Sequence, residues 1–237
     1  MLELTWLGHA AFRIKSEGKN LFIDPWIKGN PASPFKSYKN IKMADLVFVT
    51  HDHNDHGFRD AVRICRRTGA TFIGIDELTR KARRNLVRDV AGGNIGGEIE
   101  IKDIKVYFTP AWHSSKVGVP CGFIIRFHDY NIYHPGDTGF FCDMEYLGKL
   151  FKIDLMMVPI CPRYMMGLNE LVWAIEKLKP KIIVPMHYNT FPQIYTDFEA
   201  ILKKLSEVTN IQNLMVNSPT ELSGQIKKIQ NEKQIIN

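Results

Sequence analysis

The sequence predicts an α/β protein with two packed, mixed sheets and helices on their outer faces. Three observations lead to this fold class. Short apolar runs of β type alternate with longer amphipathic runs along most of the chain. The 237 residues include 45% hydrophobic and 24% charged residues, which is ordinary for a globular protein, so 1–237 is expected to form a single domain. Finally, metal-binding residue types occur immediately after several of the apolar runs.

The first part of the chain alternates strands with two helices. The predicted strands cover residues 2–7, 11–15, 21–24, 45–50 and 71–75. A helix is predicted over 58–68, because apolar residues recur at helical spacing up to Gly69. A second helix is predicted over 77–90, and the glycine cluster 92–97 is expected to form a turn region.

The second part of the chain repeats this alternation and ends in a polar tail. The predicted strands cover residues 98–102, 104–109, 122–127, 131–134, 154–159 and 181–185. The predicted helices cover residues 143–151, 169–178 and 196–207. The tail 223–237 has sparse apolar positions and is expected to form a short helix or to fray, without a catalytic role.

A cluster of metal-binding residue types follows the apolar run 45–50. Residues 51–57 read His-Asp-His-Asn-Asp-His-Gly. His51 and His53 are two residues apart, so on extended backbone they point the same way and suit one metal ion. Asp55 and His56 point elsewhere and suit a second ion close by. A polar surface turn is the alternative, but His and Asp at the ends of later strands argue for a metal site.

Five stretches of the chain match sequence motifs of a known family, in the right order. They are the metal-binding segment 51–57 and the motifs at 5–12, 111–115, 133–139 and 184–192. With them the chain resembles the metallo-β-lactamase superfamily, and most closely its branch of largely uncharacterised predicted metal-dependent hydrolases. It is more distantly similar to ascorbate-6-phosphate lactonase and to the phospholipase D that cleaves N-acyl-phosphatidylethanolamines. The resemblance covers about residues 1–192 and implies a four-layer αβ/βα sandwich of two similar halves, roughly 1–120 and 121–220.

The resemblance also implies a ligand set for two divalent metal ions. The matching positions are His51, His53 and His113 for the first ion, Asp55, His56 and His187 for the second, and Asp137 as the bridge. Zinc is the first expectation, and manganese, iron or nickel are alternatives, because mixed histidine and carboxylate sites admit all of them. Three imidazoles leave an open position on a tetrahedral ion, as a catalytic site requires.

Such a centre implies a hydrolytic mechanism. Two ions lower the pKa of a shared water from ~15.7 toward ~7, so a metal-bridged hydroxide is available to attack a carbonyl carbon or a phosphorus. Asp55 is expected to be catalytic by orienting the nucleophile and taking its proton. Tyr164 and Tyr188 are candidate proton donors to the leaving group.

Two further residues are candidates for supporting the ligands. Asp24 follows a strand and matches a carboxylate that the superfamily places against a ligand histidine. A plain Asp-Pro turn is the alternative for this residue. His9 belongs to the first motif and is expected to line the site or to bond a ligand, with a structural histidine as its alternative.

The charge of the chain bears on its substrate. The net charge is +6 and the isoelectric point about 9.1, which favours a small anionic substrate such as an ester, lactone or phosphoester. Candidate contacts are the arginines and lysines on the predicted helix 77–90, for which a solvated helix face is the alternative, and Lys28, Lys36 and Lys39 in the loop 26–43. A nuclease or phosphodiesterase acting on nucleic acid is the first alternative, and a non-catalytic metal-binding protein is the second.

Weaker signals in the sequence bear on where the protein is located and on whether it forms oligomers. The amino terminus begins as a strand without the features of a signal peptide, and no apolar run is long enough to span a bilayer, so we expect a cytoplasmic protein with no membrane partner. The four cysteines show no metal-binding spacing and are expected to be free, buried thiols, and Cys161 is also a candidate for the pocket lining. Aromatics in 26–38 and the pair Met165 and Met166 leave room for a self-association surface, and thus for a homo-oligomer.

Overall fold

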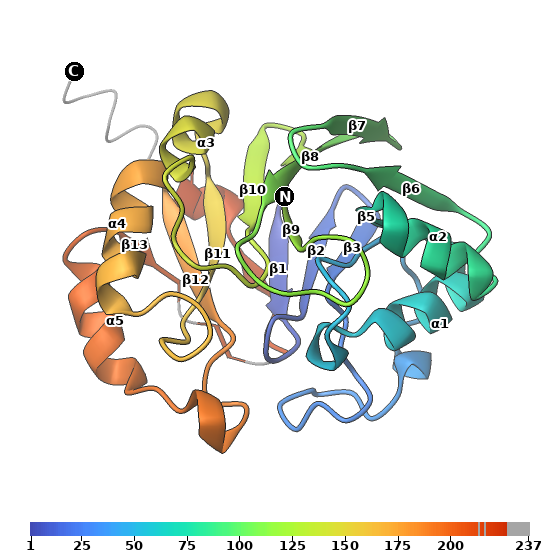
Figure 1. Ribbon diagram of the computed structural model, residues 1–237, viewed down its shortest axis with the longest axis horizontal. Helices are drawn as coiled ribbons and strands as arrows, with labels where there is room; N and C mark the ends of the chain where they lie inside the picture. Colours follow the sequence, from blue (N-terminus) through green and yellow to red (C-terminus); the bar gives the residue numbers. More distant parts are fainter. Residues whose placement is uncertain (213, 216, 227–237) are drawn as a thin grey trace.

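The computed structural model describes residues 1–212, 214, 215 and 217–226, so most of the polar tail, 227–237, lies outside the described residues. Two seven-stranded sheets pack face to face, and helices cover the outer face of each sheet (Figure 1). This is the four-layer arrangement of mixed sheets that the sequence predicted.

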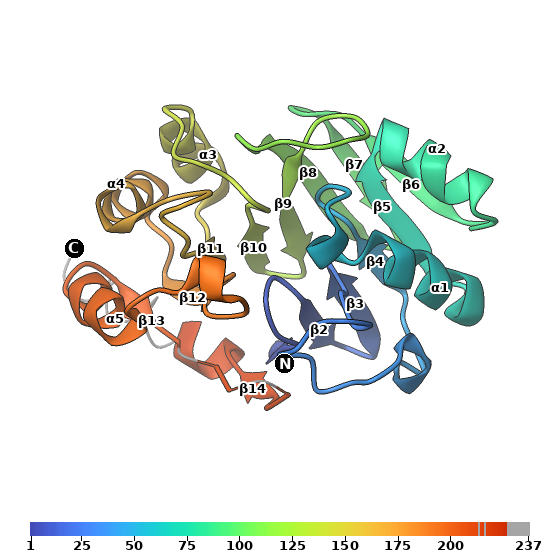
Figure 2. The same ribbon diagram turned by 60° about the horizontal axis from the view of Figure 1, so that its bottom comes forward.

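The first sheet has the order β14-β1-β2-β3-β4-β5-β6. Its strands are β1 (Glu3–Trp6), β2 (Phe12–Ser16), β3 (Lys19–Ile23), β4 (Leu46–Phe48), β5 (Thr71–Ile75), β6 (Val90–Gly93) and β14 (Thr220–Glu221). The pairs from β14 to β3 are antiparallel, and those from β3 to β6 are parallel. β14 brings the end of the described chain back beside the first strand (Figure 2).

The second sheet has the order β13-β12-β11-β10-β9-β8-β7. Its strands are β7 (Glu98–Ile101), β8 (Ile104–Pro110), β9 (Cys121–Phe127), β10 (Tyr130–His134), β11 (Leu155–Pro159), β12 (Ile182–Met186) and β13 (Asn210–Ile211). The pairs from β7 to β10 are antiparallel, and those from β10 to β13 are parallel. The chain enters this sheet at its edge strand β7, directly after the edge strand β6 of the other sheet.

Helices flank the two sheets on opposite sides of the molecule (Figure 1). α1 (Phe58–Thr68) and α2 (Asp76–Arg84) lie against the first sheet, and α3 (Met144–Phe151), α4 (Leu168–Leu178) and α5 (Phe198–Ser206) against the second. Three short 3₁₀ turns, η1 (Tyr38–Asn40), η2 (Asn54–His56) and η3 (Pro192–Ile194), lie in the connecting loops. The core between the sheets is rich in aromatic side chains. Phe123 of the second sheet packs edge to face on Phe48 of the first sheet, at 5.3 Å between ring centroids, and on its neighbour Phe108 at 5.5 Å.

The prediction for residues 77–90 and for the glycine cluster was wrong in part. α2 ends at Arg84, and Gly92 and Gly93 belong to strand β6, not to a turn. The glycines are needed there for close packing, since a Cβ on Gly93 would lie 2.3 Å from the Phe108 ring. The two-residue strands β13 and β14 were not predicted, because two residues carry no periodic pattern.

The residues expected to offer a self-association surface are largely covered. Trp26 and Met166 are buried, and Phe35 and Tyr38 are half-buried against the core. The expectation that these side chains are exposed was therefore wrong, because they pack the loop 26–43 and the 161–167 turn onto the fold. In the described part of the chain, no helix is long and apolar enough to cross a membrane.

The cysteines give a first testable prediction. Cys65, Cys121 and Cys161 are buried free thiols, as predicted, but the prediction was wrong for Cys142, which is exposed because it lies in the turn before α3. Burial raises the pKa of Cys65 to about 12 and that of Cys121 well above its usual value, which suppresses the reactive thiolate. A thiol reagent at pH 8 is expected to modify only Cys142 in the native protein and all four cysteines after denaturation, as read by peptide mass spectrometry. Fast native labelling of Cys65 or Cys121 would contradict this packing.

Candidate metal centre

The residues predicted as metal ligands meet at the ends of strands from both sheets. His51, His53, Asp55 and His56 lie in the segment that follows β4 and contains η2. His113, Asp137 and His187 follow β8, β10 and β12 of the second sheet. Buried strands thus deliver the side chains to one place between the sheets.

The three histidines predicted for the first ion form one group. The ligand atoms of His51, His53 and His113 all lie within 4.8 Å of one another. His51 Nε2 lies 2.9 Å from His53 Nδ1, and the rings of both are edge to face with that of His113. This is a spacing from which three imidazole nitrogens can share one cation.

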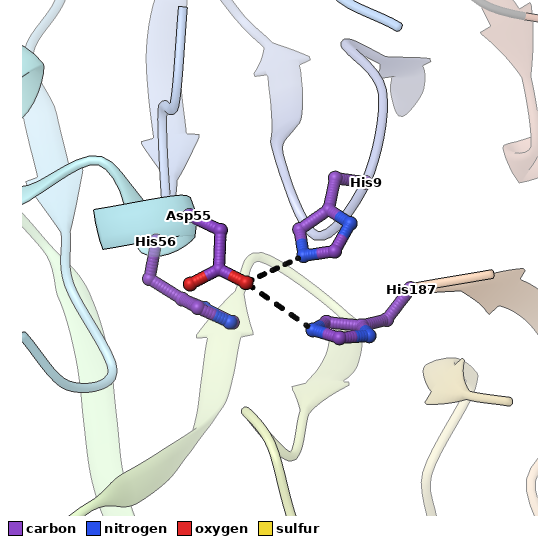
Figure 3. A group of neighbouring side chains, drawn as sticks. All are labelled: His9, Asp55, His56 and His187. Atoms are coloured by element: carbon purple, nitrogen blue, oxygen red, sulfur yellow. Dashed lines mark ion pairs between the residues drawn. The ribbon is translucent and has the colours of Figure 1, made fainter. Parts of the chain in front are cut away.

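The residues predicted for the second ion form another group, and His9 joins it. The ligand atoms of His9, Asp55, His56 and His187 also lie within 4.8 Å of one another. Asp55 Oδ2 is 3.3 Å from His9 Nε2 and 4.0 Å from His187 Nε2, and the side chains converge from separate segments (Figure 3).

Asp137 lies between the two groups. Its Oδ2 atom is 4.0 Å from His51 Nε2 and 3.6 Å from His113 Nε2, which are predicted for the first ion. The same oxygen is 3.1 Å from His56 Nε2 and 3.2 Å from His187 Nε2, which are predicted for the second. One carboxylate oxygen therefore faces nitrogens from both sets.

The unsatisfied polar atoms of this cluster fit divalent cations. Among the described residues, His56 Nε2, His187 Nε2 and Asp137 Oδ1 are buried and make no hydrogen bond. Such groups are costly to bury unless a partner compensates them. Imidazole and carboxylate are also the donors that zinc and its neighbours prefer. The residues present fit a metal centre.

Protonation of the cluster follows from the same contacts. Burial opposes the charged form of His56, but the carboxylates of Asp137 and Asp24 outweigh burial and hold its pKa well above the usual value. For His187, Asp137 likewise overcomes burial and raises the pKa to about 9. The two histidines in turn hold the pKa of Asp137 well below its usual range, against the effect of burial. The cluster thus pairs anionic carboxylate with positive charge, which a cation would supply.

A buried network around Asp24 orients two of the histidines. Asp24 Oδ2 is 2.7 Å from His56 Nδ1 and accepts a hydrogen bond from the Thr50 hydroxyl, also at 2.7 Å. Because that hydroxyl donates to Asp24, its oxygen is free to accept from His51 Nδ1 at 3.0 Å. Both imidazoles then carry a proton on Nδ1 and turn Nε2 toward Asp137, where a metal ion would displace any proton on Nε2. The geometry matches the supporting role predicted for Asp24, and Thr50 was not foreseen.

The backbone is strained at three of these positions. His9, Asp24 and His187 have φ values of 59°, 44° and 58°, in the left-handed region that non-glycine residues rarely adopt. The amide of His187 donates to the carbonyl of His9 at 3.2 Å, and Trp6 Nε1 donates to the same carbonyl at 2.9 Å. These bonds hold the strained residues and join the two sheets directly beside the cluster.

A second network lies next to the metal motif and was not predicted from the sequence. Asp52 Oδ2 pairs with Lys81 Nζ at 2.9 Å, and its Oδ1 accepts from Ser115 Oγ at 3.0 Å and from the Lys116 amide at 2.8 Å. Burial opposes ionisation of Asp52, but Lys81 and the two donors outweigh it and lower its pKa. Asp52 thereby fastens the loop of His113 to the segment of His51 and His53.

The two candidate proton donors lie apart from the cluster. The ring of Tyr188 is stacked between Trp6 and Phe198, and burial raises its pKa to about 12. Tyr164 is half exposed beside Arg163. Neither hydroxyl contacts a predicted ligand within the described residues, so the structure does not bring these two to the site.

Gly57, at the start of α1, allows the metal segment to lie close against the loop after β3. It has φ 68°, and a Cβ there would lie 2.4 Å from the Trp26 amide nitrogen and 2.6 Å from the Pro25 carbonyl oxygen. Gly69, at the other end of α1, has φ 77° and open space around it. Gly57→Ala is expected to lower the free energy of unfolding by about 1–3 kcal/mol more than Gly69→Ala, because only the first adds a steric clash to backbone strain. Urea unfolding measures the difference, and equal losses would contradict the close approach.

Comparisons with known proteins agree with this fold and with a metal-dependent hydrolase. The model of the beta-lactamase superfamily domain matches residues 3–187. A UPF0173 metal-dependent hydrolase of Staphylothermus marinus is 44% identical over 228 residues, covering 93% of this chain and 98% of the relative. A second, from Methanopyrus kandleri, is 39% identical over 229 residues, with 93% and 98% covered.

A solved structure shows the same arrangement at a lower identity. Igni18, described as a novel metallo hydrolase from the hyperthermophilic archaeon Ignicoccus hospitalis, matches with a TM-score of 0.85 and 37% sequence identity. The match covers 92% of this chain and 97% of Igni18. The chain therefore belongs to the beta-lactamase superfamily and, within it, to the UPF0173 metal-dependent hydrolases.

Proposed function

We propose that this hydrolase holds two divalent metal ions and cleaves an ester, lactone or phosphoester bond in a small anionic substrate. The observation that carries the proposal is the position of Asp137 Oδ2, within 4.0 Å of nitrogens from both histidine groups. His51, His53 and His113 would hold one ion. Asp55, His56 and His187 would hold the other, and Asp137 would be shared.

Bound there, divalent ions would supply Lewis acidity and lower the pKa of water, so that a nucleophile is available near neutral pH. We assign Asp55 the role of orienting the attacking water. Burial favours its neutral form, but His9 and His56 outweigh burial and hold its pKa well below the usual range. A carboxylate kept ionised in this way accepts a hydrogen bond well and retains a proton poorly. Orienting the water is therefore its main contribution, and the proton passes on to the leaving group or solvent.

His9 is assigned to the second ion as an additional ligand. The Thr190 hydroxyl donates to the Tyr188 carbonyl at 3.3 Å, so it accepts from His9 Nδ1 at 2.9 Å. Burial and the nearby His187 lower the pKa of His9 to about 4, so a metal ion at Nε2 would compete with only a weakly held proton. That buried nitrogen faces Asp55 Oδ2 at 3.3 Å without a hydrogen bond. A metal ion at this position would bind both the His9 nitrogen and the Asp55 carboxylate.

The first test combines metal content with turnover. Protein loaded with zinc or with manganese is assayed on a chromogenic phosphodiester and on a chromogenic lactone, and bound metal is counted by mass spectrometry. We expect two ions per chain and turnover of at least one substrate. Turnover of the phosphodiester alone would identify phosphoryl chemistry, and turnover of the lactone alone carbonyl chemistry.

Matched variants assign the roles. Asp55→Asn is expected to abolish turnover, whereas Asp103→Asn, which changes an exposed carboxylate on the surface, should not. His9→Gln is expected to lower occupancy of the second ion and to alter the visible spectrum of cobalt-substituted protein. If Asp55→Asn kept both ions and full turnover, the role of Asp55 would be wrong. One ion per chain in fully loaded wild-type protein would overturn the paired centre.

A further inference from the structure

A cavity of about 540 Å³ borders the metal centre on the side of His53. We call it the His53 cavity. Its walls come from the loop after β3, the metal segment, the first turn of α1, the end of α2 and the loop of His113. The charged residues that line it are Lys28, Asp52, Arg59, Asp60, Arg63, Lys81 and Lys116.

Both acidic residues in this lining are buried and occupied by internal donors. Asp52 is held by Lys81, Ser115 and the Lys116 amide, as described above. Asp60 Oδ2 accepts hydrogen bonds from the amides of Ile27 at 2.9 Å and Lys28 at 2.7 Å, and its Oδ1 pairs with Arg63 at 3.5 Å. Neither carboxylate is therefore available to the remaining cations of the cavity.

Three of the five cations have no such partner. The side chains of Lys28, Arg59 and Lys116 make no ion pair or hydrogen bond within the described part of the chain, and all three are exposed. Lys81 and Arg63 are paired with the two buried carboxylates. The cavity therefore presents an excess of positive charge within a few residues of a predicted metal ligand.

The surrounding segment concentrates positive charge as well. Residues 28–88 contain thirteen lysines and arginines against six aspartates and glutamates, whereas the whole chain carries a net charge of +6. The excess positive charge of the molecule thus resides in the segment that contributes most of the residues lining this cavity. A field of one sign around a hollow raises the local concentration of anions.

We propose that the His53 cavity binds an oxyanion group of the substrate, a phosphate or a carboxylate, on Lys28, Arg59 and Lys116 while the bond to be cleaved lies at the histidine cluster. This inference rests on the proposed function and specifies its substrate class. The substrate then carries a charged group separate from the group that is hydrolysed. Arg59 supplies the planar donor fork suited to such an oxyanion, and the two lysines supply point charges.

A neighbouring basic cavity makes a polyanion the competing occupant. It is lined by Tyr38, Lys39, Lys42, Arg63, Arg66 and Arg67, and it shares Arg63 with the His53 cavity. Arg67 is engaged with the carbonyls of Lys39 and Ile41. A nucleic acid would use both cavities, whereas a small anion at the metal centre would use only the His53 cavity. The two occupants can therefore be distinguished by which lysines and arginines contribute to binding.

The test is isothermal titration of metal-loaded protein with inorganic phosphate at low salt. The triple variant changes three residues of the His53 cavity: Lys28→Gln, Arg59→Gln and Lys116→Gln. The control variant removes the same amount of charge around the neighbouring basic cavity: Lys39→Gln, Lys42→Gln and Arg66→Gln. We expect the dissociation constant to rise roughly tenfold in the first and less than twofold in the control, because exposed charge contacts each contribute a fraction of a kcal/mol to ~1 kcal/mol. Metal content is measured for every protein.

Each other outcome overturns the inference. An unchanged dissociation constant in the first variant would mean that phosphate binds at the metals alone, and equal changes in both would mean an unspecific effect of net charge. Tight, salt-sensitive binding of a single-stranded RNA 12-mer, weakened equally by both variants, would identify a polyanion surface instead. Metal content and turnover of the wild-type protein report on the proposed function separately, so its failure would be recognised independently of the titration.

Discussion

Asp137→Asn is expected to reduce bound metal from two ions to at most one per chain and to lower turnover ~10³-fold or more, since metal charge stabilisation amounts to several kcal/mol. The reason is the position of a single carboxylate oxygen between His51 and His113 on one side and His56 and His187 on the other. An amide cannot supply the negative charge that the four imidazoles and two cations share. Mass spectrometry of bound metal and the chromogenic assay measure both losses.

The matched control is Asp154→Asn. Asp154 is also a buried aspartate of the second sheet, where it pairs with Lys181 and accepts a hydrogen bond from the Asn131 amide at 2.7 Å. Its substitution is expected to lower stability without removing metal. Two tightly bound ions in Asp137→Asn would show that this carboxylate is not shared between the sites.

Asp24→Asn is expected to weaken metal binding 10- to 100-fold, the range typical when a residue that orients a ligand is lost. The carboxylate accepts from the Thr50 amide at 2.8 Å, from the Thr50 hydroxyl at 2.7 Å and from His56 Nδ1 at 2.7 Å. An asparagine must present its NH₂ group to at least one of these donors. His56 then loses the bond that turns its Nε2 toward Asp137. Competition with a chromophoric chelator gives the metal affinity.

Thr50→Val and Thr79→Val separate orientation from general packing. Both remove a buried hydroxyl, but Thr50 links Asp24 to His51, whereas Thr79 donates to the Asp76 carbonyl within α2. Only Thr50→Val should weaken metal binding. If Thr79→Val weakened it equally, the loss would reflect stability and not histidine orientation.

Local sequence signals were sufficient for most of the fold. The apolar runs that became β5, β9 and β11 are short and bounded by polar residues, and the helix at 58–68 ends at Gly69 as predicted. The fold class, the family and the activity as a metal-dependent hydrolase are confirmed. α2 was predicted too long. It ends where Leu86 takes a left-handed φ of 65° and the Val87 amide donates to the Ala82 carbonyl, and a leucine gives no sequence signal for such a turn.

The ligand positions could be predicted because each follows a strand, and the structure brings all seven of them together. Their roles in binding metal stay predictions. The partners that orient them were harder to find. Thr50, Lys81 and Thr190 act through contacts across 26 to 181 residues, and no local pattern marks a threonine or lysine as such a partner. Lys28, Lys36 and Lys39 of the loop 26–43 were candidate substrate contacts, but of this loop only Trp26, Lys28 and Gly29 line the His53 cavity.

The convergence of both sheets on one cluster has a consequence for unfolding. An ion held jointly by His56 and His187 would join points 131 residues apart in the chain, much as a covalent crosslink does. Such a closure restricts the unfolded ensemble, and binding energy that exists only in the folded protein adds to its stability. Metal supply would then regulate not only how fast this enzyme works but also how long each molecule survives proteolysis.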